Sequence, residues 1–330
     1  MVPKIHSAAR HYFQTFLSAA QDLSRSLPRR DRPFRIGTLY AGATNICNAR
    51  CVFCAYKTST SPRGHLPFAT FKRASDDYVE LGGRVISFTP TVGDPLVDPG
   101  FFSKLEYALG LKCIQRVYFH TNGILLASNN NYRSLVDLRV PEIHISMSQP
   151  ERSAYRQIYG VDAYPKLMEG LSLLLEYNRR QGEPCAINID FRSSIPAWQI
   201  QETTDFKVFI RPYLGLAVTT TCMPNYDNWG GMIQQKHLPG AMRLRRVPKV
   251  KTVMCRRMED IAILWDGSVR LCACRLQETE FDELVVGNLG SLSLKEILQS
   301  PRVEAVKASF RRRELLPVCR DCSLYETSWF

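Results

Sequence analysis

Three cysteines, Cys47, Cys51 and Cys54, lie within one short stretch of the chain. They follow an extended apolar run at 36–43 and precede a loop rich in Ser, Thr and Pro. Thiolates at this spacing can surround one metal centre, and iron–sulfur clusters are held by such thiolates. A structural zinc site needs four ligands, whereas three protein ligands on a [4Fe–4S] cluster leave one iron open. We therefore predict an open iron–sulfur cluster, with a zinc loop that borrows a distant ligand as the alternative.

A second set of cysteines forms two pairs toward the C-terminal end: Cys255 with Cys272, and Cys319 with Cys322. Residues 258–271 predict a β-hairpin around the Asp-Gly pair at 266–267, a strong turn signal, and this hairpin would bring the first pair together. A capping box that begins at Ser293 predicts a helix, which leads the chain toward the second pair. Four thiolates suit either a structural zinc or an auxiliary iron–sulfur cluster.

Composition sets outer limits on the function. The chain has 330 residues with 45% apolar content and a formal net charge of +12, enough for one or two packed domains whose field attracts anions. Eleven cysteines at these spacings favour metal ligation over disulfides. No signal-peptide pattern and no run near ~18 apolar residues is present, so we expect a cytoplasmic protein without a membrane partner. The basic clusters at 242–257 and 311–313 lack interleaved aromatics, so we expect no nucleic-acid partner.

Short extended runs alternate with helical patterns from residue 36 onward, which predicts an α/β fold with a parallel sheet. The predicted strands are 36–43, 84–90, 115–121, 142–147, 185–192 and 207–219. The predicted helices are 68–81, 100–110, 131–138, 151–179 with a break near Gly160, and 197–205. Residues 1–35 predict a helical extension. Cys113 and Cys185, at the starts of their strands, are expected to be buried packing residues.

Two predicted strands alternate between apolar and polar residues. Residues 142–148 place Ile143 and Ile145 on one face and His144 and Ser146 on the other. Residues 185–192 follow the same pattern, with Asp190 on the polar face. If the apolar faces pack on helices, the polar faces line the inside of a barrel and can hold a polar ligand. An edge strand with one face in water is the alternative.

The Cys-x3-Cys-x2-Cys stretch, with Phe53 before its third cysteine, resembles the radical S-adenosylmethionine (SAM) superfamily. The resemblance implies a partial (β/α)6 TIM-like barrel whose cluster binds SAM and yields a 5′-deoxyadenosyl radical. It also implies SAM contacts from residues at the strand ends: Phe53, Gly93, Asp94, Pro95, Asn122, Ser146 and Arg192. The turn at 91–95 departs from the family's Gly-Gly-Glu-Pro pattern, because Val92 and Asp94 replace Gly and Glu.

The second cysteine set resembles the C-terminal SPASM/twitch extension of this superfamily. A full SPASM module needs further cysteines, so we predict the shorter twitch form, a small α+β domain with one auxiliary [4Fe–4S] cluster on Cys255, Cys272, Cys319 and Cys322. The predicted organisation is an extension at 1–35, a barrel at 36–234, a basic connector at 235–254 and the twitch domain at 255–330.

The resemblance implies hydrogen-atom abstraction from a substrate C–H bond, followed by oxidation, decarboxylation or epimerisation. We expect a small polar, sugar- or nucleoside-like and anionic natural-product intermediate, with Asp190, Tyr226 and Asn228 as candidate substrate contacts. Cys274 and Cys222 are candidate hydrogen-atom donors. A flavodoxin or ferredoxin would supply electrons. The alternatives are a maturase of a ribosomally made peptide and a non-catalytic zinc-binding protein. The sequence leaves the oligomeric state open.

Overall fold

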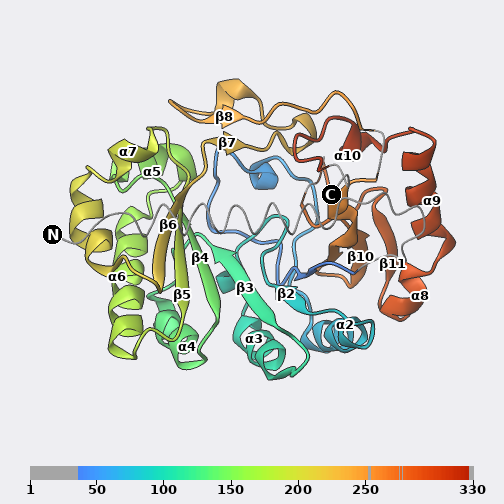
Figure 1. The fold of residues 1–330 in the computed structure, drawn as a ribbon, viewed down its shortest axis with the longest axis horizontal. Helices are drawn as coiled ribbons and strands as arrows, with labels where there is room; N and C mark the ends of the chain where they lie inside the picture. The colour runs from blue at the N-terminus through green and yellow to red at the C-terminus, as the bar shows by residue number, and fades with distance from the viewer. Residues whose placement is uncertain (1–35, 252–253, 275, 277, 327–330) are drawn as a thin grey trace, which may run out of the picture.

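A nine-stranded sheet runs through the computed structural model, which describes residues 36–251, 254–274, 276 and 278–326 (Figure 1). The strand order is β11-β10-β9-β1-β2-β3-β4-β5-β6. Strands β1 to β6 are parallel to their neighbours: β1 Leu39–Ala41, β2 Val85–Ser87, β3 Arg116–Thr121, β4 Glu142–Met147, β5 Ala186–Phe191 and β6 Val218–Cys222. The predicted partial (β/α)6 barrel is confirmed, and the helical extension predicted at 1–35 lies outside the described residues.

Helices connect these strands and pack on the outer face of the curved sheet. They are α2 Phe68–Glu80, α3 Phe101–Gly110, α4 Asn131–Asp137, α5 Arg152–Tyr159, α6 Tyr164–Arg180 and α7 Ala197–Ile200. The predicted break is confirmed, because Gly160 ends α5 with a left-handed φ of 68°. Short helical turns fill the loops: η1 Ala55–Lys57, η2 Pro95–Val97, η3 Ser128–Asn130, η5 Arg211–Tyr213, η6 Trp229–Gly231, η7 Gln235–His237 and η8 Arg256–Glu259.

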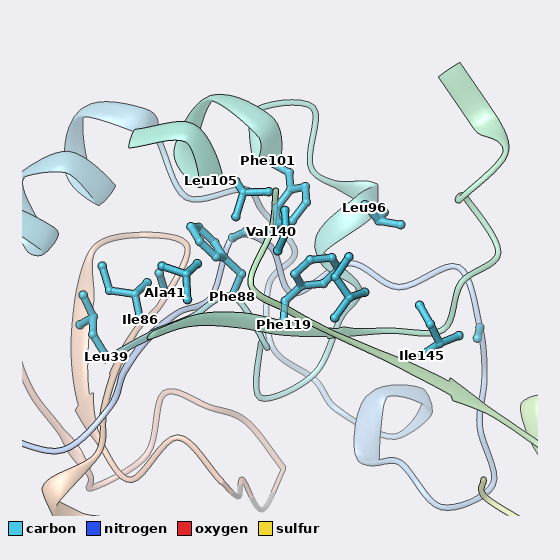
Figure 2. Close-up of a cluster of buried hydrophobic side chains, with 14 of the residues drawn as sticks. Leu39, Ala41, Ile86, Phe88, Leu96, Phe101, Leu105, Phe119, Val140 and Ile145 are labelled. Atoms are coloured by element: carbon cyan, nitrogen blue, oxygen red, sulfur yellow. The ribbon is translucent and has the colours of Figure 1, made fainter. Parts of the chain in front are cut away.

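Aromatic and aliphatic side chains fill the space between the sheet and its helices (Figure 2). Phe88 and Phe119 come from the strand side, and Phe101 and Leu105 come from α3. All four side chains are fully buried, and Phe101 contacts both strand-side rings edge-on. Burial of each such side chain contributes about 1.5–3 kcal/mol, so this layer fixes the sheet on which the site is built.

The polar faces of the central strands line the inside of the barrel, as the alternation predicts. On β4, Ile143, Ile145 and Met147 are buried while the residues between them are partly exposed. The register places His120, His144, Asn188 and Thr219 side by side across β3, β4, β5 and β6. One row of polar side chains therefore crosses four neighbouring strands.

Two predictions about local structure are wrong. The sixth strand, predicted at 207–219, begins only at Val218, and Phe206–Ile210 forms a π-helix, η4. Phe206 and Ile210, four residues apart, are buried while the three residues between them are exposed. A short apolar run fits a strand or a helix equally well, and here the helical face packs. Cys185 is buried as expected, but Cys113 is exposed.

The C-terminal part extends the same sheet. The predicted hairpin is β9 Ile261–Ile263 with β10 Ser268–Leu271, and β11 Val285–Asn288 adds a strand that the pattern did not predict. Strand β9 pairs in parallel with β1, so the cysteine-rich region joins the edge of the barrel. Three helices follow: α8 Leu294–Leu298, which begins at the predicted capping box, α9 Pro301–Arg311 and α10 Pro317–Arg320. The predicted domain boundaries stay a prediction.

A second, two-stranded sheet crosses one end of the barrel and consists of β7 Asn225–Tyr226 and β8 Arg243–Leu244. Among the described residues, no helix is both long and apolar enough to cross a membrane.

Candidate active site

The loop with Cys47, Cys51 and Cys54 is docked on the end of α5. The backbone N–H of Arg50 donates to the Tyr159 carbonyl, and that of Val52 donates to the Ile158 carbonyl, each at 2.9 Å. These carbonyls belong to the last turn of a helix, where they lack helical partners. A Cβ on Gly160 would lie 2.6 Å from the Arg50 carbonyl oxygen, so glycine both ends α5 and lets the loop approach.

The three thiols of this loop form a cluster that suits a bound metal centre. Burial is the main cause that raises the pKa of Cys47 to about 12, and burial together with Cys54 and Cys47 raises that of Cys51. Burial thus disfavours the thiolate form that a metal needs as its ligand. A bound metal offsets this cost, because a coordinated thiol loses its proton. The side-chain nitrogen of Asn48 is buried without a hydrogen-bond partner among the described residues. The donor set therefore fits an iron–sulfur cluster.

Two predicted SAM contacts lie directly beside this loop. Gly93 has a left-handed φ of 125°, and a Cβ there would lie 2.6 Å from the Thr44 carbonyl oxygen. Asn122 Nδ2 donates to Asn48 Oδ1 at 2.6 Å and lies 3.7 Å from the sulfur of Cys47. The end of β3 and the turn after β2 thus converge on the first cysteine.

Asp94 connects that turn to the end of β3. Its buried carboxylate accepts hydrogen bonds from the Thr121 hydroxyl at 2.9 Å and from the backbone N–H groups of Asn122 at 2.7 Å and Leu96 at 3.0 Å. Burial raises its pKa to about 6, although these donors favour the charged form. Pro95 follows at the first position of η2. Asp94 therefore holds the turn in place, and its predicted contact with SAM stays a prediction.

Aromatic and polar side chains surround Phe53. Its ring lies 5.7 Å from that of Tyr159 and 5.5 Å from that of Tyr226. The guanidinium of Arg192 lies 5.8 Å from the Phe53 ring, and its Nε donates to Ser146 Oγ at 3.3 Å. Four of the predicted cofactor and substrate residues, from four separate segments, thus meet at one place; their individual roles stay predictions.

The second cysteine set also gathers. Burial raises the pKa of Cys255 to about 12, with the nearby Cys272 thiol as the next cause. The pKa of Cys319 is raised by burial and by Cys272 and Cys322. Cys272 has its pKa lowered to about 7, chiefly by a hydrogen bond from the Cys274 thiol. The four predicted ligands are therefore mutual neighbours.

Buried cations support this second site. Lys251 Nζ donates to the carbonyls of Cys319, Arg320 and Cys322, each at 2.8 Å. Arg270, fully buried, pairs with Asp282 through two hydrogen bonds of 2.9 and 2.6 Å and also donates to the Cys272 carbonyl. Part of the basic excess is thus internal and positions the cysteine loops.

One segment connects the two cysteine sites. Trp229 Nε1 donates to the Phe53 carbonyl at 2.8 Å. Asn228 Nδ2 donates to the Asp321 carbonyl at 2.7 Å, and Asn228 Oδ1 accepts from the Ser323 N–H at 3.2 Å. Asn228 was predicted to contact substrate, which stays a prediction; its observed bonds hold the loop that carries Cys322.

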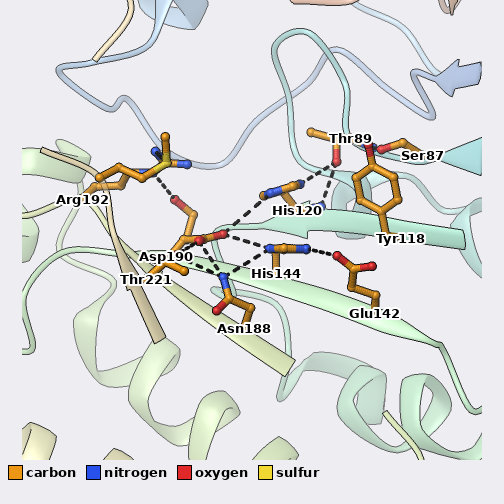
Figure 3. Close-up of polar contacts among 12 residues, drawn as sticks. Ser87, Thr89, Tyr118, His120, Glu142, His144, Asn188, Asp190, Arg192 and Thr221 are labelled. Carbon is orange, nitrogen blue, oxygen red and sulfur yellow. Dashed lines mark hydrogen bonds and ion pairs between the residues drawn. The ribbon is translucent and has the colours of Figure 1, made fainter. Parts of the chain in front are cut away.

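Inside the barrel, His120, His144, Asp190 and Glu142 form one polar cluster (Figure 3). The sequence did not predict that these residues meet. Asp190 Oδ2 lies 3.1 Å from His144 Nδ1 and 3.7 Å from His120 Nε2. The outer nitrogen of each ring has a partner: Glu142 Oε1 lies 2.6 Å from His144 Nε2, and Thr89 Oγ1 lies 2.9 Å from His120 Nδ1. The period-two alternation of β3 to β5 was the available signal.

The two candidate hydrogen-atom donors lie in different places. Cys222 is half-buried at the end of β6, where it interacts electrostatically with Arg192 and Tyr226. Cys274 interacts with Cys272, Arg257 and Asp260 beside the second cysteine set. The structure therefore places Cys222 near the Phe53 group and Cys274 beside the second cysteine set.

Comparison with protein families identifies these features. Residues 43–206 match the model of the radical SAM superfamily, and residues 255–323 match that of the SPASM iron–sulfur cluster-binding domain. The chain belongs to the radical SAM superfamily. Its cofactors are accordingly SAM, a [4Fe–4S] cluster that binds it, and an auxiliary [4Fe–4S] cluster of the SPASM region.

Curated relatives cover only part of this radical SAM chain. The chain is 24% identical over 139 residues to a GTP 3′,8-cyclase of Alkaliphilus oremlandii, covering 42% of this chain and 43% of that protein. It is 25% identical over 132 residues to a GTP 3′,8-cyclase of Chlorobaculum tepidum, covering 40% and 39%. The chain thus spans about two fifths of the length of these relatives.

Solved structures resemble it over most of its length. BtrN in complex with AdoMet and 2-DOIA aligns with a TM-score of 0.55 at 15% identity, covering 88% of this chain and 94% of BtrN. The protein anSMEcpe with bound AdoMet aligns with a TM-score of 0.54 at 15% identity, covering 86% of this chain and 88% of anSMEcpe. At this identity the likeness shows the fold alone.

Proposed function

We propose that this radical SAM enzyme removes a hydrogen atom from a C–H bond of a small polar, anionic, sugar- or nucleoside-like metabolite, with oxidation, decarboxylation or epimerisation as the outcome. The observation that carries the proposal is the polar row inside the barrel. His120, His144, Asn188 and Thr219 face the interior at one level, and Asp190 lies one level closer to the cysteine loop. Such side chains cost free energy to desolvate, so their placement favours a polar ligand.

The chain's own residues would position the reacting groups. When bound, the cluster and SAM supply the 5′-deoxyadenosyl radical, chemistry that belongs to the cofactor. Cys47, Cys51 and Cys54 would hold that cluster. Phe53 with Tyr226 and Tyr159 would form the apolar wall beside the nucleoside, and Arg192 with Ser146 would meet its polar groups.

An anionic substrate follows from the charge. The chain carries a formal net charge of +12, and Arg192 projects beside the Phe53 group at the end of β5. A positive field draws anions toward the site and disfavours a polycationic substrate. The partial relatives named GTP 3′,8-cyclase act, by that name, on a nucleoside triphosphate, which supports the nucleoside branch of the proposal.

The fate of the substrate radical depends on which group reacts with it after abstraction. The position of Cys222 favours it over Cys274 as a donor of a hydrogen atom to the substrate, the route to epimerisation. The SPASM cluster on Cys255, Cys272, Cys319 and Cys322 would instead take up an electron if the substrate is oxidised. A flavodoxin or ferredoxin would supply the electron that starts the reaction in the cytoplasm.

A peptide maturase is the second candidate. The fold is also shared with anSMEcpe, solved with AdoMet and the Cp18Cys peptide at a TM-score of 0.52. Strand β6 is an edge of the sheet with exposed Thr219 and Thr221, and a sheet edge can accept an extended peptide. The polar interior favours the small molecule over the peptide.

An anaerobic assay separates the candidates. The reconstituted enzyme is supplied with a reductant, SAM and one of three probes: GTP, 2-DOIA or the Cp18Cys peptide. The expected result is substrate-dependent release of 5′-deoxyadenosine with GTP, the anionic probe, and none above background with the peptide. Release with 2-DOIA alone would count against the anionic part of the proposal. Stimulation by the peptide alone would reverse the proposal. Cys51→Ser is the control, because it removes a predicted cluster ligand.

Deuterium then separates the outcomes. In deuterated solvent, stable uptake at a substrate carbon that disappears in Cys222→Ala but persists in Cys274→Ala supports epimerisation. A loss of two mass units without uptake supports oxidation, and a loss of carbon dioxide supports decarboxylation.

A further inference from the structure

We propose that His120 and Asp190 together form a hydroxyl-recognition site in the barrel interior, at which a hydroxyl group of the substrate donates to Asp190 and accepts from His120. The proposal rests on the proposed function, since it names the chemical group by which a polyol or ribose-bearing substrate is held. It concerns residues of β3 and β5 rather than the SAM contacts around Phe53.

The separation of the two groups is the first observation. His120 Nε2 and Asp190 Oδ2 lie 3.7 Å apart, which is too long for a direct hydrogen bond. A hydroxyl oxygen placed at ~2.8 Å from each atom would satisfy both, one as its donor and one as its acceptor. The gap therefore matches a group that can donate and accept at once.

The surroundings of His120 set its tautomer. Thr89 Oγ1 accepts the backbone N–H of His120 at 3.0 Å, and the same oxygen lies 2.9 Å from His120 Nδ1. The Thr89 hydroxyl hydrogen is thus free to point at Nδ1, which then acts as an acceptor and leaves the ring proton on Nε2. An Nε2–H facing the carboxylate of Asp190 avoids the repulsion of two lone pairs. His120 therefore presents a hydrogen-bond donor to the interior.

The groups around His120 keep it uncharged. Burial and the facing His144 ring of β4 lower its pKa to about 3, and Arg192 of β5 acts in the same direction. Asp190 of β5 and Glu142 of β4 oppose the shift without reversing it. A neutral imidazole can act as a fixed hydrogen-bond donor without drawing a proton from the ligand.

Other residues fix Asp190 in place. His144 Nδ1 contacts Asp190 Oδ2 at 3.1 Å, and Asn188 Nδ2 donates to Asp190 Oδ1 at 2.7 Å, where the Thr221 hydroxyl also donates. Although burial opposes it, the hydrogen bonds to Asp190 and Glu142 raise the pKa of His144 and favour its cationic form. The carboxylate is thereby held charged and oriented, so its remaining acceptor capacity points toward His120.

Among the residues that the structure describes, nothing closes the site to a ligand. The His120 side chain is 33% exposed, compared with 8% for Asp190, and the neighbouring Thr219 and Thr221 of β6 are exposed. A ligand hydroxyl can thus reach His120 from the interior without displacing the sheet.

A metal ion is the competing occupant of these residues. His120, His144 and Asp190 each offer a ligand atom, all within 4.8 Å of one another. The two rings, however, stack at 4.1 Å with their planes 18° apart. The in-plane lone pairs of nearly parallel rings do not meet at one ion, and both nitrogens of His144 already bond to carboxylates. The geometry favours a hydroxyl over a metal.

Acylation with diethyl pyrocarbonate tests the state of His120 without a known substrate. The SAM-loaded holoenzyme is treated at pH 7.5 and 5.5, and labelling of each histidine is measured by peptide mass spectrometry against an added histidine model peptide. A histidine with an ordinary pKa near 6.5 loses its labelling about tenfold over this interval. We expect the His120 rate to change less than about twofold. A tenfold loss would overturn the proposal, whereas slow labelling that does not change between the two pH values supports it.

Protection then tests ligand recognition. Labelling is repeated with myo-inositol or GTP, and we expect either probe to slow His120 labelling at least about fivefold while His65 is unchanged. Thr89→Val should weaken this protection, because it removes the donor to Nδ1, whereas Thr203→Val, which removes a hydroxyl that donates to the Ile200 carbonyl at the end of α7, should not. Lack of protection by both probes overturns the proposal. So does a metal equivalent beyond the cluster iron that His120→Gln removes.

The same samples separate this inference from the proposed function. Release of 5′-deoxyadenosine is measured alongside labelling. Substrate-dependent release without protection of His120 overturns the inference alone. Protection without release by any probe leaves the hydroxyl site standing and counts against the proposed function.

Discussion

Replacing Asn228 by alanine separates two roles for a residue between the cysteine sites. Asn228 Nδ2 donates to the Asp321 carbonyl at 2.7 Å, and Oδ1 accepts from the Ser323 N–H at 3.2 Å. Asn228→Ala removes both bonds in the loop that carries Cys322. If the role is structural, the auxiliary cluster should become labile; if Asn228 binds substrate, the cluster should be unaffected.

The magnitude follows from burial. The Ser323 N–H is buried, whereas Asp321 is exposed. Water can therefore replace the lost bond to the Asp321 carbonyl but not the lost bond from the Ser323 N–H. A buried donor left without a partner costs about 1–3 kcal/mol. Since about 1.4 kcal/mol corresponds to a factor of ten, the opened form of the loop should become roughly 5- to 150-fold more populated.

Release of iron to a chelator under anaerobic conditions measures this opening. We expect the iron of the auxiliary cluster to be released about 5- to 150-fold faster in Asn228→Ala. Asn225→Ala, an exposed neighbour in β7, is the matched control and should behave as the unaltered protein. Unchanged iron release together with a raised KM for substrate would refute the structural reasoning and restore the substrate contact.

Four further substitutions test other parts of the structure. Cys51→Ser and Cys319→Ser should each lose about half of the iron and sulfide, and only Cys51→Ser should lose SAM binding; zinc without sulfide in the unaltered protein would contradict both. Gly160→Ala introduces a Cβ at a φ of 68° and 2.6 Å from the Arg50 carbonyl oxygen, so it should destabilise the protein by more than about 1 kcal/mol, measured by urea unfolding. Gly182→Ala is the control for backbone strain alone, because Gly182 has a φ of 78° but a Cβ there meets no described atom within 4 Å; the loss of stability should be larger at Gly160. Glu142→Gln should destabilise by about 1–2 kcal/mol at pH 6. The pKa of His144 is raised in the folded state, so its contribution to stability is present below the unfolded pKa and is lost as pH rises through the folded pKa. The difference in unfolding free energy between Glu142→Gln and the unaltered protein should therefore narrow by pH 8.5. A difference that does not change with pH would contradict a charged His144 paired with Glu142.

The sequence predicted the barrel well where its pattern was local. Alternation in β4 and β5 placed Ile143 and Ile187 outside and His144 and Asp190 inside, because side chains of a strand point to opposite faces. The Asp-Gly turn and the capping box at Ser293 also held, since each is decided within a few residues.

Predictions that depended on long-range packing did worse. The apolar run at 206–210 carries no sign of whether Phe206 and Ile210 will pack together, so the sixth strand was placed too early. Nothing near Asn228 in the sequence indicates its bonds to residues 321–323, about 95 positions away. The bonds of the Asp94 carboxylate to the end of β3 were likewise not predicted, because only the fold brings these residues close; its contact with SAM stays a prediction.

The sheet fixes the distance between the two cysteine sites. Strand β1 precedes the first cysteine loop and pairs with β9, whose hairpin partner β10 leads into Cys272. The Trp229 and Asn228 bonds connect the same two regions from the other side. A relative movement of the sites would have to break strand pairing and these side-chain bonds together, which makes it costly compared with a hinge at a few loop residues. We therefore infer that any electron transfer between the clusters occurs over a constant separation.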